Sequence, residues 1–346
     1  MGIVFLALVA CNGKDYAYET GDSAVTGIGV CGKVRGTTGV LMYQYAGDQL
    51  TVLPPEDSPD ESDVTTGVAG PFGDHTYLAV TDGGVIRSDD AGCNWEPAGS
   101  LPPGDWGLVQ AGDRVYAFDR DSDAGARSDD LGLSWSAFLT SEAFVSLPVA
   151  DAANPDRLRG VQARGVVTTD DAGESWPVQD GSLPDGLTPV SASASPGDLE
   201  QLAVAGAGGV WRSANGGTSW DQIFVTGDAY SVAIHPDDAT YTFAFGRDTD
   251  GLLSGWRHDG TDWAKLVTEA QIDMAEGMEI WPVPGNTAQA VSAYGPVPNN
   301  DDEPSLALYV MTVDEGTKTT RVTMYYHLHQ LVFGPDRWVG AVDSKE

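Results

Sequence analysis

The sequence predicts an all-β protein in which similar four-stranded units close into a ring, and three observations carry the prediction. An eight-residue phrase, Ser/Thr-x-Asp-x-Gly-x-x-Trp, recurs in complete or reduced form with starts at residues 43, 88, 128, 169, 213, 256 and 312. Runs rich in Val, Tyr, Phe, Ile and Thr surround the copies and are typical of strands. No segment combines helical length with a 3.6-residue period. The repeats therefore predict a seven-bladed β-propeller of four-stranded blades over residues 25–346.

The elements of each unit follow one order, which residues 106–139 illustrate. The run "RVYAFD" (114–119) comes before the phrase, followed by a second run, "GARS" (125–128); a third run, "SWSAFL" (134–139), follows the phrase, and the link between units adds a fourth, such as "WGLVQAG" (106–112). Short turns rich in Gly or Asp separate the runs. Each unit therefore supplies four short strands, the number expected of a propeller blade.

We call this phrase the repeat turn. Its Ser or Thr and its Asp can bond nearby backbone amides, its Gly allows a positive φ, and its Trp buries a large ring beside the corner. The copies at 88–95, 128–135 and 169–176 are complete, Asn215 replaces the Asp in 213–220, and 43–50, 256–263 and 312–319 are reduced. The residues expected to shape the four best copies are Ser88, Asp90, Gly92, Trp95, Ser128, Asp130, Gly132, Trp135, Thr169, Asp171, Gly173, Trp176, Ser213, Asn215, Gly217 and Trp220.

The two ends of the chain are expected to share blade one. Residues 25–38 offer "VTGIGVCGKV" and little else, so blade one lacks at least one strand. Past the last repeat turn, "HQLVFG" (329–334) and "RWVGAV" (337–342) have no blade of their own. Because exposed sheet edges invite aggregation, we expect these C-terminal strands to join blade one and close the ring.

The repeat turn resembles the Asp-box, or bacterial neuraminidase repeat, of sialidases, sortilin-type receptors, xyloglucanases and photosystem II assembly propellers. The resemblance extends over roughly residues 25–346. It implies that the turn is a structural corner between the third and fourth strands, away from the ligand face. It does not imply one activity, because the members of these families share none.

The first residues predict export. The apolar run Ile3–Ala10 is too short to span a membrane and is typical of a signal peptide (1–10). The following "LVAC", Leu8–Cys11, resembles the lipobox of bacterial lipoproteins, which implies lipidation of Cys11, a flexible tether (11–24) and a cell-envelope location on the outer-membrane, periplasmic or cell-surface side. No Lys or Arg precedes the run, and a cleaved ordinary signal or a misassigned start codon is the alternative.

Charge and cysteine usage limit the partners. The chain has 51 acidic and 18 basic residues, for a net charge of −33, which disfavours nucleic acid and anionic lipid headgroups. The acidic residues are spread along the chain, as is typical of a solubilising surface, and we expect a monomer.

Besides Cys11 there are Cys31 and Cys93, which form either one disulfide or two free thiols.

The sequence favours a non-catalytic binding or scaffold propeller that recognises a protein or glycan partner through its inter-blade loops. A sialidase would carry a Phe/Tyr-Arg-Ile-Pro stretch and an arginine triad, but the stretch is absent. Four of the thirteen arginines, Arg87, Arg127, Arg212 and Arg257, lie at one recurring position beside the repeat turn and indicate a structural role. The alternative is a secreted glycoside hydrolase that uses two carboxylates on the same face.

Three groups of residues are candidate sites. Asp119, Asp121 and Asp123 alternate in one turn, a spacing that can wrap Ca²⁺, although a solvated acidic turn is the simpler interpretation. Trp106 and Trp281 are candidate aromatic platforms for a ligand, or blade packing. His327 and His329 alternate on a strand but lack a third zinc ligand. No cofactor is expected other than Ca²⁺.

Overall fold

The computed structural model describes residues 31, 33–37, 39–46, 49–53, 64–73, 75–82, 84–179, 183–224, 227–248, 250–251, 253–269, 279–298, 304–313, 316–323, 327–334 and 337–343. These residues form 27 strands. No helix that could cross a membrane is found among them. The predicted signal peptide (1–10), Cys11 and the tether (11–24) lie outside the described residues.

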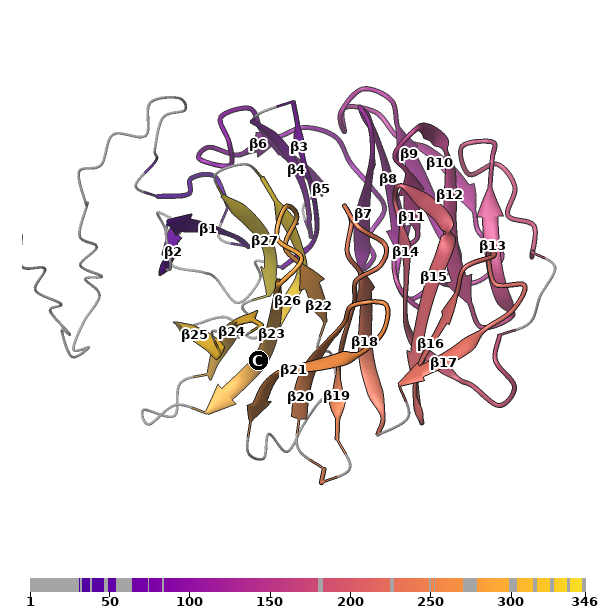
Figure 1. The fold of residues 1–346 in the computed structure, drawn as a ribbon. Helices are drawn as coiled ribbons and strands as arrows, with labels where there is room; N and C mark the ends of the chain where they lie inside the picture. The colour runs from indigo at the N-terminus through magenta and orange to yellow at the C-terminus, as the bar shows by residue number, and fades with distance from the viewer. Residues whose placement is uncertain are drawn as a thin grey trace, which may run out of the picture.

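The strands form seven sheets arranged in a ring (Figure 1), so the predicted seven-bladed propeller is confirmed. Blade 2 has β3 (Thr65–Phe72), β4 (Thr76–Thr81), β5 (Gly84–Ser88) and β6 (Glu96–Pro97). Blade 3 has β7 (Trp106–Ala111), β8 (Arg114–Asp119), β9 (Ala124–Ser128) and β10 (Ser136–Leu139). Blade 5 has β14 (Pro189–Ser195), β15 (Asp198–Gly206), β16 (Gly209–Ser213) and β17 (Asp221–Phe224).

The C-terminal half continues the same order. Blade 6 has β18 (Ala229–Ile234), β19 (Thr242–Arg247), β20 (Leu253–His258) and β21 (Trp263–Glu269). Blade 7 has β22 (Ile280–Pro282), β23 (Gln289–Pro298), β24 (Pro304–Thr312) and β25 (Gly316–Thr323). The repeat turns join third strands to fourth strands, as predicted. We call the face that carries them the repeat-turn face, and the opposite face, with the inter-blade links, the loop face.

Blade 4 has three strands, β11 (Val149–Asp151), β12 (Asn154–Gln162) and β13 (Gly165–Thr169). A single bridge between Val167 and Val178 occupies the place of its fourth strand. Pro177 lies in this segment and has no backbone N–H to donate, so a regular ladder cannot form there.

The two ends of the chain complete blade 1, as predicted. Its sheet has the order β2 (Gln49–Leu53), β1 (Val40–Ala46), β27 (Trp338–Asp343) and β26 (His327–Phe333). The N-terminal β1 pairs antiparallel with β27, with Val40 opposite Ala341 and Tyr43 opposite Trp338. In Figure 1 the indigo strands β1 and β2 lie beside the late strand β27. The ring is therefore closed by backbone hydrogen bonds between its termini.

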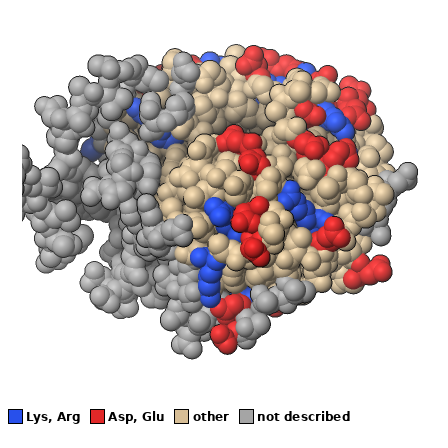
Figure 2. All heavy atoms as spheres, in the orientation of Figure 1, with Lys and Arg blue, Asp and Glu red and all other residues tan. Residues whose placement is uncertain are grey.

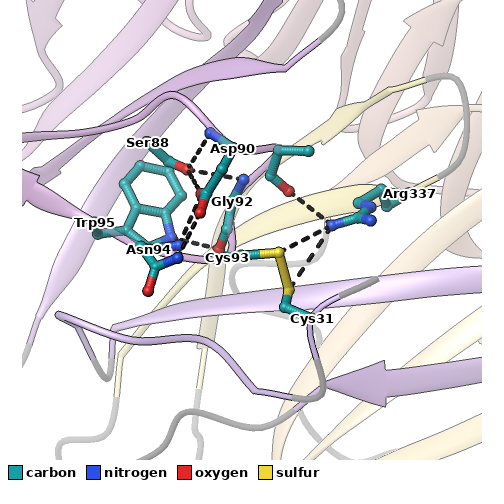
Figure 3. The surroundings of a disulfide bond; sticks show 9 residues. Cys31, Ser88, Asp90, Gly92, Cys93, Asn94, Trp95 and Arg337 are labelled. Atoms are coloured by element: carbon teal, nitrogen blue, oxygen red, sulfur yellow. Dashed lines mark hydrogen bonds between the residues drawn. A yellow bond between two sulfur atoms is a disulfide. The ribbon is translucent and has the colours of Figure 1, made fainter. Parts of the chain in front are cut away.

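A disulfide reinforces this closure (Figure 3). Cys31 is bonded to Cys93 in the repeat turn of blade 2, which settles the pairing that the sequence left open. Arg35 of the same N-terminal segment exchanges backbone hydrogen bonds with this turn: its N–H donates to Cys93 O (2.9 Å), and its carbonyl accepts from Trp95 N (2.9 Å). The Arg337 guanidinium, before β27, donates to Ala91 O (3.1 Å) and contacts Cys93 Sγ (3.4 Å).

The apolar core is divided among the blade interfaces. Seven clusters of buried side chains are found, and each joins one pair of neighbouring blades. Between blades 3 and 4, for example, the Trp176 ring lies 5.9 Å from Phe118 and 5.1 Å from Phe144, measured between ring centroids. Each blade is therefore stabilised mainly by its two neighbours, as expected of a repeat architecture.

Hydroxyl side chains protect the inner edges of the blades. The first strands of neighbouring blades lie against each other around the axis. The Ser191 hydroxyl of β14 accepts from Val232 N (3.1 Å) of β18, and the Ser231 hydroxyl of β18 accepts from Ile280 N (3.0 Å) of β22. Backbone N–H groups that have no further strand to pair with are satisfied in this way.

The charged side chains are dispersed. In the view of Figure 2, Asp and Glu side chains form several separate groups, and Lys and Arg side chains lie beside them. This distribution agrees with a solubilising role for most of the acidic residues.

Candidate functional site

The four best repeat turns share one hydrogen-bond network. In the blade 3 copy the Ser128 hydroxyl accepts from Gly132 N (2.8 Å) and donates to Asp130 Oδ1 (2.8 Å). Asp130 also accepts from the backbone N–H and the hydroxyl of Ser134 (2.8 and 2.5 Å), and the Trp135 indole donates to Gly132 O (3.1 Å). Bonds equivalent to those between the first, third and fifth residues recur at Ser88, Thr169 and Ser213.

Each of these turns has two successive left-handed residues, where only the Gly was expected to have a positive φ. Before Gly92, Gly132 and Gly173 stand Ala91 (φ 62), Leu131 (φ 54) and Ala172 (φ 60). In blade 5 the same position is Gly216 (φ 68). The hydrogen bonds of the turn therefore hold a non-glycine residue in a conformation that it rarely adopts.

The carboxylates of the repeat turns are held ionised by the turns themselves. Burial alone would raise the pKa of Asp90 and Asp171, but hydrogen bonds from Asn94 and from Ser175 and Thr169 lower both values overall. The hydrogen bond from Ser134 is the main cause of the lowered pKa of Asp130. Because their oxygens bond the turn's own amides and hydroxyls, these carboxylates serve the corner rather than a ligand.

The recurring arginines connect neighbouring blades. Arg127 donates to Ala172 O (3.1 Å) in the next repeat turn, and Arg212 donates to Thr240 O (3.2 Å) of the next blade. Arg257 reaches Thr287 O of blade 7 (3.4 Å). Arg87 instead pairs with Asp89 (2.7 Å) in its own turn.

The turn of blade 6 begins later than predicted. The strand β20 ends at His258, so the turn begins there, two residues after the predicted start at residue 256.

A groove of about 550 Å³ lies on the repeat-turn face of blade 2. Its lining includes Asp89, Asp90, Glu96 and the exposed side chain of Leu133 from blade 3. Asp89 and Asp90 are already engaged, by Arg87 and by Asn94 respectively.

Two of the predicted site residues lie side by side on the loop-face side, because Trp106 of β7 is directly opposite Asp119 of β8. Trp281 belongs to β22 of blade 7. The carboxylate of Asp119 accepts from Asp121 N (3.0 Å) and from the Ser122 hydroxyl (2.8 Å). No group of three or more His, Cys, Asp or Glu side chains suited to a metal ion is found in the described part of the chain, and Ca²⁺ binding at Asp119, Asp121 and Asp123 stays a prediction. Trp106 is 3% exposed and its indole donates to Pro102 O (2.7 Å), whereas Trp281 is half-buried.

A centre that the sequence did not indicate lies where the inner strands meet the loop face. Arg120 follows β8, and its guanidinium donates to Asp105 Oδ1 (2.8 Å) of the link between blades 2 and 3. It also donates to Thr66 O (2.9 Å) on the inner strand of blade 2 and to His329 O (3.3 Å) on the inner strand of blade 1. One side chain thus connects three blades at the axis. We call Thr66, Asp105, Arg120 and His329 the axial mouth.

Glu279 is a second acidic residue on the loop-face side. It directly precedes β22, the inner strand of blade 7, and its side chain is exposed to solvent. The surrounding protein raises its pKa by desolvation, while the positive charge of Arg120 opposes this shift and the negative charge of Asp105 adds to it. The axial mouth therefore holds one guanidinium paired with one carboxylate, and Glu279 is an exposed residue at the start of the neighbouring blade 7.

Sequence reasoning missed the axial mouth because its members are more than 250 residues apart in the extreme case, from Thr66 to His329. One local signal was present: Arg120 is an arginine that does not stand at the recurring position beside a repeat turn. Its partners could be identified only once the order of the blades around the ring was known.

Comparison with known proteins adds support for the fold. No protein-family model and no curated protein matches the sequence. Among solved structures, a GH74 enzyme from Niastella koreensis aligns with 19% identity and a TM-score of 0.53, over 74% of this chain and 36% of that chain. YCF48 from Cyanidioschyzon merolae aligns with 15% identity and a TM-score of 0.52, over 81% of this chain and 95% of that chain.

A structure of YCF48 bound to a D1 peptide aligns with 12% identity and a TM-score of 0.53, over 90% of this chain and 99% of that chain. At these identities the similarity shows that the chain has the β-propeller fold. The chain spans less than half of the GH74 structures that it matches, 36% and 45% of their length for two of them.

Proposed function

We propose that the protein is a non-catalytic binding propeller that recognises a protein partner through its loop face, at the axial mouth. The observation that carries the proposal is Arg120, which is held in place by groups from the link between blades 2 and 3 (2.8 Å), from blade 2 (2.9 Å) and from blade 1 (3.3 Å). A charged centre that is fixed before a ligand arrives loses little entropy on binding, which favours recognition. In contrast, the polar groups of the repeat turns form hydrogen bonds within the turns themselves.

A structural neighbour with a bound peptide supports the same proposal. YCF48, one structure of which contains a bound D1 peptide, aligns with 90% of this chain. A ring of this fold is therefore suited to peptide binding.

A glycoside hydrolase is the second candidate, and one observation favours it. Asp105 of the axial mouth and Glu279 at the start of blade 7 are two acidic residues on the loop-face side, and the pKa of Glu279 is raised, as a general acid requires. We favour binding because Asp105 is engaged by Arg120 at 2.8 Å, so it is not free to act as a nucleophile or base.

Selection of ligands from a random peptide library tests the proposal. Peptides selected on the wild-type protein are expected to bind Arg120→Ala at least about tenfold more weakly, equivalent to about 1.4 kcal/mol. Arg87→Ala, which removes an arginine from the repeat-turn face, is the matched control and should bind normally. Asp105→Asn, which keeps the size of the side chain, provides a second test if Arg120→Ala lowers the melting temperature.

Two outcomes would contradict the proposal. The first is that the selected peptides bind Arg120→Ala and Asp105→Asn as well as the wild type. The second is turnover of chromogenic glycosides that is lost in Asp105→Asn, which would identify the second candidate instead.

We further propose that the protein is exported and anchored through Cys11. The apolar run and "LVAC" support this proposal, as does the Cys31–Cys93 disulfide, since disulfides persist mainly in oxidising compartments. Mass spectrometry of the mature protein should find a lipidated Cys11 at the N-terminus, and Cys11→Ser should release the protein from membranes. A free N-terminus at another residue would contradict the proposal.

A further inference from the structure

We propose that the repeat turn of blade 6 is an acid-sensitive element of the ring, in which protonation of His258 breaks the turn and loosens the contact between blades 5 and 6. The inference goes beyond the proposed function, because it concerns the repeat-turn face and a response to pH. It depends on one difference between this turn and the four best copies, namely the chemistry of the first residue.

The first residue of a repeat turn accepts backbone N–H groups of the same turn. In blade 3 the Ser128 hydroxyl accepts from Asp130 N (3.4 Å) and from Gly132 N (2.8 Å). In blade 6 the turn begins at His258, and the imidazole Nδ1 accepts from Gly260 N (3.2 Å), the amide two residues further on. A hydroxyl keeps its charge between pH 5 and 8, whereas an imidazole does not. The blade 6 turn therefore has an imidazole where the four best copies have a hydroxyl.

This hydrogen bond fixes the protonation state of His258. Because Nδ1 accepts, the neutral ring carries its proton on Nε2. A second proton would be added to Nδ1, where it would face the N–H of Gly260, and two donors would then oppose each other. The His258 side chain is 7% exposed, so water cannot replace the lost acceptor unless the ring moves. Protonation therefore breaks the bond and displaces the imidazole.

The charged groups around His258 act in opposite directions. Burial lowers the pKa of His258 most, and the positive charge of Arg212, on β16 of blade 5, lowers this pKa further. The carboxylates of Asp259 and Asp262, in the same turn, raise it, but the pKa remains below the ordinary value for histidine. The Asp259 carboxylate also accepts from the backbone N–H groups of the next two residues but one (3.0 and 2.9 Å), so it is held by the turn.

Three further titratable side chains at this end of blade 6 face other groups. Arg257 precedes His258 on β20 and lies 5.2 Å from the centre of the Tyr241 ring. His235, after β18, is bonded through Nε2 to a backbone carbonyl of blade 7 (3.1 Å). Asp238, in the turn between β18 and β19, faces the arginine of β16. The charges that act on His258 are therefore those of this arginine and of its own turn.

Trp263 transmits the movement to the neighbouring blade. The His258 ring lies 5.0 Å from the Trp263 ring, measured between centroids. The Trp263 indole donates to Ile223 O (2.7 Å) of blade 5, and its ring lies 5.0 Å from Phe224. These three residues pack in the apolar cluster between blades 5 and 6. Displacement of the imidazole therefore changes the packing between the two blades.

The lowered pKa of His258 gives the pH range of the effect. The folded protein binds the proton more weakly than the unfolded chain does, so the stabilising bond is fully present above the unfolded value, about 6.5. The stability is lost as the pH falls below this value and through the folded pKa. Carboxylates titrate near about pH 4, so the range from pH 7.5 to 5.0 reports mainly on histidine.

An NMR titration of the wild-type protein tests the inference without a substitution. The Gly260 amide and the Trp263 indole signals are expected to shift with the same midpoint as the His258 imidazole, below about pH 6.5. In His258→Asn, whose side-chain oxygen can accept as Nδ1 does, neither signal should shift between pH 7.5 and 5.0. His75→Asn, which removes an exposed histidine from the turn between β3 and β4, is the matched control and should titrate like the wild type.

Thermal unfolding provides a second measurement. Between pH 7.5 and 5.0 the melting temperature of the wild type should fall about 2 °C further than that of His258→Asn. His258→Ser, which supplies the hydroxyl of the other turns, should behave like His258→Asn and replaces it if the asparagine variant does not fold.

Two results would overturn the inference. The first is a His258 imidazole that titrates while the Gly260 and Trp263 signals stay constant. The second is an equal loss of melting temperature in the wild type and in both variants. Neither result affects the proposed function, because the axial mouth lies on the opposite face.

Discussion

Asp130 shows how a single residue shapes the repeat turn. Its two carboxylate oxygens accept from Ser128, from Ser134 N and from the Ser134 hydroxyl, so they satisfy several donors at once. Trp135 then packs beside the turn with its indole bonded to Gly132 O. These bonds hold Leu131 at a φ of 54°. We therefore assign the repeat turn to the stability of the ring and not to ligand binding.

Replacement of Asp130 by Ala should lower the free energy of unfolding by about 1–3 kcal/mol, because donors of the turn lose their acceptor. Asp113→Ala is the matched control: Asp113 is an exposed Asp on the β7–β8 turn and should change stability by no more than about 0.5 kcal/mol. Denaturant unfolding measures both values. Equal stability of the two variants would contradict a structural role for Asp130.

Replacement by Asn should instead preserve the turn. In blade 5, Asn215 Oδ1 accepts from the Ser213 hydroxyl and from Ser219 N (both 2.9 Å), as Asp130 Oδ1 does in blade 3. An amide therefore fits the same network.

The two side chains should differ in acid. Because the pKa of Asp130 is lowered in the folded protein, its ionised form stabilises the fold above the unfolded value, near about pH 4. That stability is lost as the pH falls through the folded pKa. Asp130→Asn should thus lose less stability than the wild type between neutral pH and about pH 3. An identical loss in urea unfolding at the two pH values would contradict this assignment.

Among the strands, buried side chains that bond from one blade to the next contribute most to the stability of the ring. Arg159 of β12 is 3% exposed; it donates to Thr168 Oγ1 (2.8 Å) and Leu199 O (2.6 Å) and pairs with Glu200 (3.0 Å) of β15. Arg157 of the same strand pairs with Asp170 (3.1 Å) and Glu200 (3.5 Å), but its side chain is 33% exposed.

Arg159→Ala should lower the free energy of unfolding by about 1.5–3 kcal/mol, because it leaves buried acceptors without a donor. Arg157→Ala, in the same strand and with a shared partner, should cost about 1 kcal/mol or less, because solvent screens its ion pairs. Thermal and urea unfolding of the two variants measure the difference. A larger loss for Arg157→Ala would show that exposed ion pairs, and not the buried guanidinium, join blades 4 and 5.

The sequence predicted the strands and turns well where the residues that determine them lie close together in the chain. Residues a few positions apart determine each strand, and the same holds for the repeat turn that joins β5 to β6. Blade 4 departs from the pattern because Pro177 interrupts its outer ladder. The bonds from Ser191 and Ser231 to the next blade could not be predicted, since a serine in a strand gives no indication of which neighbour it will face.

For the whole molecule, the closing sheet is the decisive feature. Deletion of residues 337–346 removes β27, which lies between β1 and β26 in blade 1. The expected result is aggregation or a markedly lower melting temperature, because two strand edges and the core between blades 7 and 1 become exposed. Deletion of residues 344–346, which leaves β27 complete, is the control. A 337–346 deletion that melts like the parent would contradict closure through blade 1.

The ring also explains why the fold was easier to predict than the site. Seven copies of one turn predicted the number of blades and their strand order, and the surplus C-terminal strands predicted the closure. The pairing of Cys31 with Cys93 remained open because residues 62 apart in sequence carry no local sign of proximity. The axial mouth was not predicted, because Arg120 and His329 meet only after blades 3 and 1 take their places in the ring.

The assignment of binding to the loop face and of stability to the repeat-turn face is tested most directly by hydrogen–deuterium exchange with and without a selected peptide. Binding at the axial mouth should slow exchange in residues 105–108, 120–124 and 327–331. The four repeat turns at 88–95, 128–135, 169–176 and 213–220 should exchange at unchanged rates. Protection confined to those turns, with no change at the axial mouth, would contradict the assignment.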